Sequence, residues 1–314
     1  MPRVPAMLPS LALVLACGGG GDAGMPDEEA FVLRPLTAER IGETAGMRSP
    51  ESALYDEALD VFYISNTDGG ASEKDGRAFI AVVPAESLTV MRVLVDGATA
   101  GVTLNAPKGL AITGDTLWVT DIDVVRGFDR RSGAPVGTID FASHDVVFLN
   151  DLAVGPNGAL YVTESGVSFG ADGSMTHPGT GRIFRIANRQ VLEVARGESL
   201  GSPNGITWQD TTGTWLVAPL SGRDVLTWTE DGSAPRPLAT GPGQYDGVIA
   251  LRDGRILVSS WADSAVHLIT HGEMTILIPN VSAPADIGYD LQRGVVAIPR
   301  ALDGKVEYFQ LRAA

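Results

Sequence analysis

The chain has 314 residues, a net charge of −15 at neutral pH and a single cysteine. Recognition of nucleic acid depends on clustered Lys and Arg, so a chain this acidic is not expected to have a nucleic-acid partner. Its apolar runs are short, are separated by many glycines and prolines, and show no sustained helical period. The composition therefore predicts one large all-β domain.

The N-terminal segment MPRVPAMLPSLALVLA has one basic residue, Arg3, followed by a short apolar core. This pattern is typical of an export signal. Cys17 follows directly, and LVLAC resembles a bacterial lipobox, in which the cysteine is lipidated; an ordinary cleaved signal with an incidental cysteine is the alternative. We predict a signal peptide over 1–16, a flexible tether over 17–30, and an exported lipoprotein that faces the periplasm or the cell surface. Its only membrane contact would be the lipid on Cys17.

Six segments of the remaining chain repeat one pattern, in which two apolar strands are joined by a short turn. The first strands read PESALYD, PKGLAIT, NDLAVGP, PNGITWQ, YDGVIAL and ADIGYDL. A third strand follows in every segment, and a fourth follows in the first five. Six such units predict a six-bladed β-propeller of four-stranded blades over 31–314. The sixth unit lacks its outer strand, and we expect FVLRPLTAERI, residues 31–41, to supply it and close the ring.

One residue at the start of each innermost strand forms a column around the expected axis. The column consists of Glu51, Lys108, Asn150, Asn204, Asp246 and Ala285. In a blade of alternating strands, these residues lie on the same face as the loops between second and third strands. The two longest such loops, 67–76 and 165–181, should therefore overhang a common mouth.

The chain contains Pro-Asn-Gly twice, and the two copies have different surroundings. Asn204 opens a strand after a Gly-rich connection, whereas Asn157 lies between two apolar runs. Asn-Gly in that second context is typical of a two-residue hairpin turn, in which both central residues have positive φ. We therefore interpret Asn157 as a turn residue only.

Four column residues offer only oxygen as a ligand. Two are carboxylates and two are amides: Glu51, Asp246, Asn150 and Asn204. This donor set suits Ca²⁺ or another hard divalent cation, and it suits zinc poorly because no histidine falls in the column. Any one of these positions could also be an ordinary turn residue. Lys108 would have to lean away from a cation, or it could pair with Glu51 or Asp246 in place of a metal.

The segments SPESALYD, LND, SPNGITW and YDG resemble the senescence-marker-protein, gluconolactonase and luciferin-regenerating-enzyme family of six-bladed propellers, over residues 48–311. The resemblance implies a divalent cation held by Glu51, Asn150, Asn204 and Asp246, and hydrolysis of a lactone or ester. It also implies a role in proton transfer for Asp151, which we take as the general base. Sugar lactonases of the family commonly have Arg where this chain has Phe148, so a fairly apolar substrate is expected.

Two functions remain open from the sequence. The first is a monomeric metal-dependent hydrolase with a small-molecule substrate. The second is a non-catalytic, membrane-tethered propeller that binds a small ligand or a protein partner. We expect Lys108, Phe148 and Asp286 at the mouth, although Asp286 could instead only cap its strand.

Overall fold

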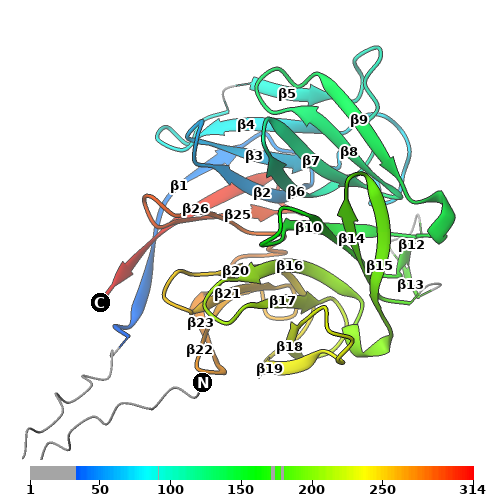
Figure 1. Ribbon diagram of the computed structural model, residues 1–314. Coiled ribbons are helices and arrows are strands. Elements are labelled where there is room, and N and C mark those ends of the chain that lie inside the picture. Colours follow the sequence, from blue (N-terminus) through cyan, green and yellow to red (C-terminus); the bar gives the residue numbers. More distant parts are fainter. Residues whose placement is uncertain (1–32, 91, 171–173, 178–179) are drawn as a thin grey trace, which may run out of the picture. The chain divides into compact units, whose positions relative to one another are not determined.

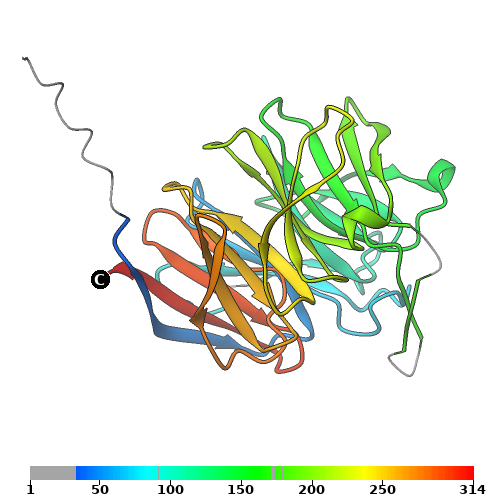
Figure 2. The same ribbon diagram turned by 90° about the horizontal axis from the view of Figure 1, so that it is seen from below.

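The computed structural model describes residues 33–90, 92–170, 174–177 and 180–314. The predicted signal peptide, Cys17 and the tether lie outside the described residues. The chain divides into two units, Met1–Arg34 and Pro35–Ala314, and the second unit forms six four-stranded antiparallel sheets. These sheets are the blades of a β-propeller, as predicted (Figures 1 and 2). No helix in the described part of the chain is long and apolar enough to cross a bilayer.

Each blade is numbered here in chain order, and its strands follow one another from the axis outward. Blade 1 consists of β2 (Pro50–Asp56), β3 (Val61–Asn66), β4 (Phe79–Pro84) and β5 (Arg92–Asp96). Blade 2 consists of β6 (Pro107–Thr113), β7 (Thr116–Asp121), β8 (Val124–Asp129) and β9 (Pro135–Asp140). Blade 3 consists of β10 (Leu149–Val154), β11 (Leu160–Glu164), β14 (Arg182–Ala187) and β15 (Gln190–Arg196).

The other three blades follow the same plan. Blade 4 consists of β16 (Pro203–Gln209), β17 (Thr214–Pro219), β18 (Asp224–Trp228) and β19 (Arg236–Thr240). Blade 5 consists of β20 (Tyr245–Ala250), β21 (Ile256–Ser260), β22 (Ala265–Thr270) and β23 (Glu273–Ile278). Blade 6 consists of β24 (Gly288–Asp290), β25 (Val295–Arg300), β26 (Lys305–Ala313) and β1 (Leu36–Ala45). A small hairpin, β12 (Ser168–Phe169) and β13 (Met175–Thr176), and two 3₁₀ turns, η1 (Ala142–His144) and η2 (Glu198–Leu200), lie in the connections.

The core lies between the blades. The packing of the second strand of each blade explains why the sequence of that strand is almost wholly apolar. Every residue of β3 is buried. Successive side chains of a strand point to opposite faces. Phe62 therefore packs in a cluster with Tyr308 of blade 6, and Tyr63 packs in another with Leu117 of blade 2. Each inner strand pair is thus covered on both faces, so alternation of polar and apolar residues is lost.

The ring is closed by pairing the N-terminal strand with the last strand. β1 runs antiparallel to β26, from the pair Leu36–Ala313 to the pair Ala45–Lys305. Figure 1 shows β1 in blue beside β26 in red. The predicted closure is confirmed, but its predicted bounds of 31–41 are wrong. The strand begins after Pro35, which has no N–H to donate, and it extends as far as β26 offers partners.

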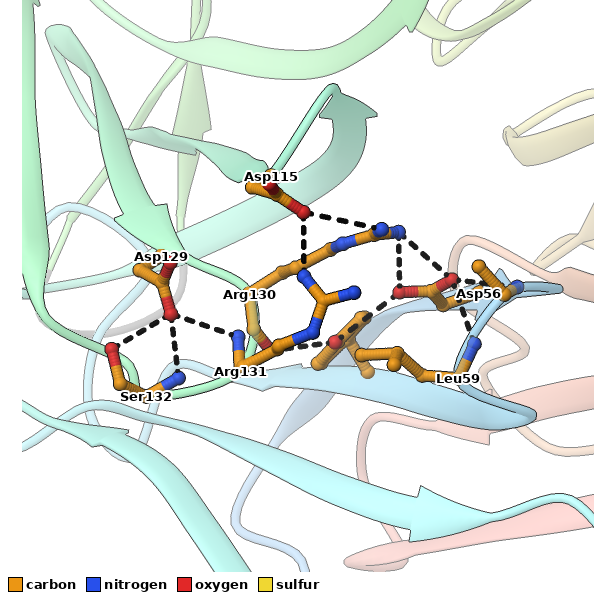
Figure 3. Close-up of polar contacts among 9 residues, drawn as sticks. Asp56, Leu59, Asp115, Asp129, Arg130, Arg131 and Ser132 are labelled. Atoms are coloured by element: carbon orange, nitrogen blue, oxygen red, sulfur yellow. Dashed lines mark hydrogen bonds and ion pairs between the residues drawn. The ribbon is translucent and has the colours of Figure 1, made fainter.

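Polar contacts also join neighbouring blades at the ends of the inner strands. Arg130, in the turn after β8, donates to both carboxylate oxygens of Asp56 at 3.1 and 3.0 Å, and its carbonyl accepts the hydroxyl of Tyr63 at 2.7 Å. Asp115 accepts a further bond from Arg131 at 2.5 Å, as Figure 3 shows. The Asp56–Arg130 pair is almost fully buried, so it orients blade 1 against blade 2.

The loop at Asn157 is a hairpin connection, as predicted, although not of the predicted type. Gly155 donates its N–H to the carbonyl of Ala159 at 2.8 Å, which encloses a three-residue loop. Of these residues only Gly158 has a positive φ, of 76°. Asn157 instead accepts the N–H of Ala159 through its side chain at 3.0 Å. A single left-handed glycine is what a three-residue hairpin loop requires.

Candidate functional site

Each column residue of blades 2–5 lies in a β-bulge of the inner strand. In these bulges two residues oppose one: Lys108–Gly109 oppose Thr120, Asn150–Asp151 oppose Thr163, Asn204–Gly205 oppose Ala218, and Asp246–Gly247 oppose Ser259. In blade 1 the extra residue is Glu51 itself. A bulge changes the direction in which side chains project. Consecutive residues such as Asn150 and Asp151 can therefore face different ends of the axis.

Hydroxyl side chains opposite the bulges hold the column in place. Thr163 accepts the backbone N–H of Asp151 at 2.9 Å and donates to the carbonyl of Asn204 in the next blade at 2.6 Å. Thr120 and Ser259 donate to the next blade in the same way. The backbone of one bulge is thus fixed both by its own blade and by the preceding one. Sequence reasoning missed these residues, although a Ser or Thr recurs near the end of most second strands.

The second residue of a bulge faces the neighbouring inner strand, and little space is available there. A Cβ atom on Gly109 would lie 2.2 Å from Oδ1 of Asp151, and one on Gly205 would lie 2.2 Å from the carbonyl oxygen of Asp246. Glycine is therefore required at these two positions. Asp151 and Asp286 are the residues that bring a carboxylate into this part of the axis.

The four oxygen donors predicted from the sequence come together at one end of the axis. Glu51, Asn150, Asn204 and Asp246 line a cavity of about 440 Å³, which we call the donor chamber. Lys108 and Phe148 also line it, as predicted. Both long loops contribute as well: Thr67, Gly69 and Ala71 from the first, Phe169 and Met175 from the second. The opening of the donor chamber is therefore formed in part by the two long loops, 67–76 and 165–181.

Asp151 and Asp286 are not brought into the donor chamber. They line a second cavity of about 580 Å³, the opposite chamber, whose other walls are residues further along the inner strands. Asp151 accepts the N–H groups of Leu152 and Ile206, each at 2.7 Å, and Asp286 accepts the hydroxyl of Ser52 at 2.5 Å. The bulge explains the separation, because it turns Asp151 away from the side of the strand to which Asn150 projects.

The two carboxylates of the donor chamber are incompletely satisfied. Oε2 of Glu51 and Oδ1 of Asp246 are buried and have no hydrogen-bond partner among the described residues. Trp261 donates its indole N–H to the other oxygen of Asp246 at 2.9 Å. Burial, and then repulsion by Asp246, raises the pKa of Glu51 well above its usual range. Burial, and then the charge of Asp286, raises the pKa of Asp246 to about 8. A bound cation would reverse both shifts.

The two amides of the donor chamber use their nitrogen atoms for internal bonds. Asn150 donates through Nδ2 to the hydroxyl of Ser165 at 3.1 Å, and Asn204 donates through Nδ2 to the carbonyl of Tyr245 at 3.3 Å. Each amide oxygen is then available to a ligand. Two carboxylates and two amide oxygens are ligands that Ca²⁺ prefers. The described residues contain no group of three His, Cys, Asp or Glu that could hold a metal, so a cation here depends on the amides.

Lys108 lies in the donor chamber but bonds to neutral groups. Its ammonium donates to the carbonyls of Ala71 and Ala106, each at 3.0 Å, and lies 4.1 Å from the ring centroid of Phe148. Burial lowers the pKa of Lys108 to about 8. The described residues show no ion pair of Lys108 with Glu51 or Asp246, although the charge of Lys108 acts on the pKa of Glu51. Lys108 also holds the loop over 67–76 against blade 2.

The rim of the donor chamber contains apolar residues that sequence reasoning missed. Leu220, Trp261 and Leu302 lie in the short loops that follow the second strands of blades 4, 5 and 6. Their shared position, one or two places after the second strand, is visible in the sequence. They lie in turns, where no hydrophobic period draws attention to them.

Solved structures with the same fold include several enzymes. A gluconolactonase from Xanthomonas campestris is 20% identical with a TM-score of 0.66, over 85% of this chain and 88% of that chain. A luciferin-regenerating enzyme is 15% identical with a TM-score of 0.64, over 88% and 95%. A virginiamycin B lyase from Staphylococcus aureus is 13% identical with a TM-score of 0.59, over 88% and 99%. No family model and no curated protein matches the sequence. The chain therefore has the gluconolactonase-type six-bladed fold, and the resemblance predicted from its motifs is confirmed at that level.

Proposed function

We propose that the protein is a divalent-cation-dependent hydrolase that cleaves a lactone or ester in the donor chamber. One observation carries the proposal: Glu51 and Asp246 each have a buried carboxylate oxygen without a hydrogen-bond partner among the described residues, and both line a cavity that two amide side chains also line. Leaving such atoms unpaired costs free energy unless a ligand satisfies them. That one of the similar structures is a gluconolactonase supports a lactone as the substrate class.

The side chains of the donor chamber would hold and orient the cation. Glu51, Asn150, Asn204 and Asp246 would hold the ion, and Ca²⁺ is the ion that this set fits best. When bound, the cation supplies a Lewis acid that polarises the substrate carbonyl. Trp261 donates its indole N–H to Oδ2 of Asp246, so Oδ1, which has no partner among the described residues, would be the oxygen that holds the ion.

Asp151 receives a different role from the one implied by the sequence resemblance. Both of its carboxylate oxygens accept backbone N–H groups in the opposite chamber. We therefore propose that Asp151 positions Asn150 and the adjoining strand of blade 4. Loss of turnover in Asp151→Asn with unchanged cation affinity and unchanged thermal stability would restore the role of general base.

No observation favours the non-catalytic alternative. The observation that would favour it is the Lys108 ammonium in the place of a cation beside Glu51 or Asp246. Its bonds to the carbonyls of Ala71 and Ala106 leave that place open.

We also propose that the protein is exported, lipidated on Cys17 and active as a monomer with a small-molecule substrate. This proposal rests on the sequence of residues 1–17. In a bacterial host, the wild-type protein should fractionate with membranes, and Cys17→Ser should release it into the soluble fraction. A wild-type protein found only in the soluble fraction would contradict the anchor.

The main experiment measures cation binding and turnover on the same preparations. Calorimetric titration of chelator-treated protein with Ca²⁺, Mg²⁺, Mn²⁺ and Zn²⁺ should show one site with preference for Ca²⁺. Lactones, aryl esters and phosphotriesters are then screened with and without EDTA. Glu51→Gln and Asn204→Ala should lose both binding and turnover while remaining folded, whereas Asp210→Asn, an exposed acid of the opposite chamber, serves as the control. Turnover that is indifferent to EDTA and to Glu51→Gln would refute the proposal.

A further inference from the structure

The donor chamber opens through a rim of exposed apolar side chains. Three of the ten exposed large hydrophobic residues among the described residues line this one cavity: Met175 at 41%, Trp261 at 37% and Leu302 at 75% exposure. Scattered exposed hydrophobic residues are ordinary on a protein surface. A set that surrounds the opening of a single cavity indicates an apolar ligand.

These residues come from separate loops that meet at the opening. Leu220, Trp261 and Leu302 follow the second strands of three consecutive blades, and all three line the cavity. Phe169 and Met175, from the hairpin of blade 3, form a second side. Phe148 continues that side inward, with its ring 5.3 Å from the ring of Phe169.

The charged groups of the cavity lie at its inner end and not on the rim. Glu51 and Asp246 belong to the column of inner-strand residues. Lys108 is 2% exposed, and its ammonium is occupied by two carbonyls and an aromatic ring. Among the described residues that line the cavity, no other side chain is charged, so no further charged group is available there for the hydroxyl groups of a sugar. The lining combines the charged and amide groups of the inner strands with apolar side chains from the loops.

We propose that the substrate is an amphiphile, a lactone or ester that carries an unbranched alkyl or acyl chain. This inference rests on the proposed function and specifies its substrate class. The carbonyl lies at the four oxygen donors, and the chain lies along Leu220, Trp261 and Leu302. In the reaction, water adds to the acyl carbon and the acyl C–O bond breaks. The leaving oxygen takes a proton, and the products are an alcohol group and a carboxylate, which in a lactone stay on one molecule.

The first test compares lactones of one ring size with ethyl, butyl, hexyl and octyl side chains. If each added methylene is removed from water by the rim, kcat/KM should rise about two- to fourfold per methylene. Leu220→Ser and Leu302→Ser should reduce this increment. Ile276→Ser is the matched control, since Ile276 is 58% exposed on the outer strand of blade 5 and should keep the wild-type increment.

The second test measures binding without turnover. Lactams with the same side chains resist hydrolysis, and their binding can be followed by the fluorescence of Trp261, with Trp261→Phe to identify its signal. Dissociation constants should fall with chain length in the wild type and less steeply in Leu302→Ser.

Chain-dependent lactam binding without hydrolysis of any lactone or ester would refute the proposed function and leave the apolar site in place. Hydrolysis that is independent of chain length, or equally chain-dependent in Leu220→Ser, Leu302→Ser and Ile276→Ser, would overturn the inference and leave the hydrolase in place.

Discussion

The two chambers on the axis contain the same kind of residue in opposite states. In the opposite chamber, Asp151 accepts two backbone N–H groups and Asp286 accepts a hydroxyl. In the donor chamber, one oxygen of Glu51 and one of Asp246 remain without a partner. The first pair of carboxylates joins neighbouring blades, whereas each carboxylate of the second pair keeps one oxygen without a partner among the described residues. The hydrogen-bond partners of a buried acid in this ring therefore depend on the chamber that it lines.

The largest expected effect is a loss of stability with rising pH when no cation is present. Burial is the first cause that raises the pKa of Glu51, Asp151, Asp246 and Asp286, the last to about 7. A carboxyl group whose pKa is raised in the folded state contributes its full stabilisation of the fold at a pH below its unfolded pKa of about 4. That stabilisation is lost as the pH rises through the pKa of the folded state. Thermal unfolding in EDTA should show a falling midpoint from about pH 5 to 8.

This pH dependence should divide between the two chambers. Saturating Ca²⁺ should remove the share of Glu51 and Asp246. Asp286→Asn should remove the share of Asp286 and also lower the pKa of Asp246, which the charge of Asp286 raises. A midpoint that rises between pH 5 and 8 in EDTA would contradict the assignment of both chambers.

Removal of Asp151 should cost more stability than removal of any other acid of the opposite chamber. Asp151→Ala leaves the buried N–H groups of Leu152 and Ile206 without an acceptor, which costs about 3 kcal/mol in the free energy of unfolding. Asp210→Ala removes an exposed acid of the same chamber and should change the free energy of unfolding by less than about 0.5 kcal/mol. Chemical denaturation in EDTA measures both. Equal effects of the two substitutions would show that charge matters here and hydrogen bonding does not.

Cation binding should stabilise the fold only through the donor chamber. At a Ca²⁺ concentration a hundredfold above its Kd, the expected gain is about 2.7 kcal/mol. Asp246→Asn should lose this gain, and Asp286→Asn should retain it. The midpoint of thermal unfolding with and without Ca²⁺ reports both. If Ca²⁺ stabilised Asp246→Asn as much as the wild type, the ion would bind at a place other than the donor chamber.

Lys108 provides the test with the smallest expected effect, which concerns the charge that its ammonium brings to the donor chamber. Its ammonium contributes to the electrostatic environment of Glu51 and would repel a nearby cation. Lys108→Met should therefore bind Ca²⁺ about tenfold more tightly, a change of about 1.4 kcal/mol. Arg312→Met, which removes an exposed positive charge paired with the exposed Glu39, is the control. Weaker binding in Lys108→Met would show that its hold on Ala71 matters more than its charge.

The sequence was sufficient to predict the ring of blades and the column of axis-facing residues, because both repeat six times along the chain. Six strand openings at corresponding positions predict both the number of blades and which residues face the axis. The structure brings Glu51, Asn150, Asn204 and Asp246 into one cavity for this reason. A single motif would not have been enough, since Asn157 has the same Pro-Asn-Gly and is a turn residue.

The parts that sequence reasoning missed depend on local geometry. Asp151 is next to Asn150, and nothing in a strand pattern reveals that a bulge separates their directions. The direction of Lys108 is decided by the carbonyls of Ala71 and Ala106, one of them in a distant loop. Leu302 lies in a turn, where an apolar residue has no period to identify it. Each of these depends on contacts between segments far apart or on one inserted residue.

The closure of the ring by β1 and β26 has a consequence for how the chain folds. Thr37 bonds to the carbonyl of Arg312, 275 residues further along the chain. Pairing across such a separation is slow, because the entropy of closing the loop is lost before the contact forms. β1 has no partner until β26 has formed, and until then blade 6 lacks its outer strand. The protein is thus most exposed to edge-to-edge aggregation just before its last step, and the open edge of β26 is where a chaperone would have most effect.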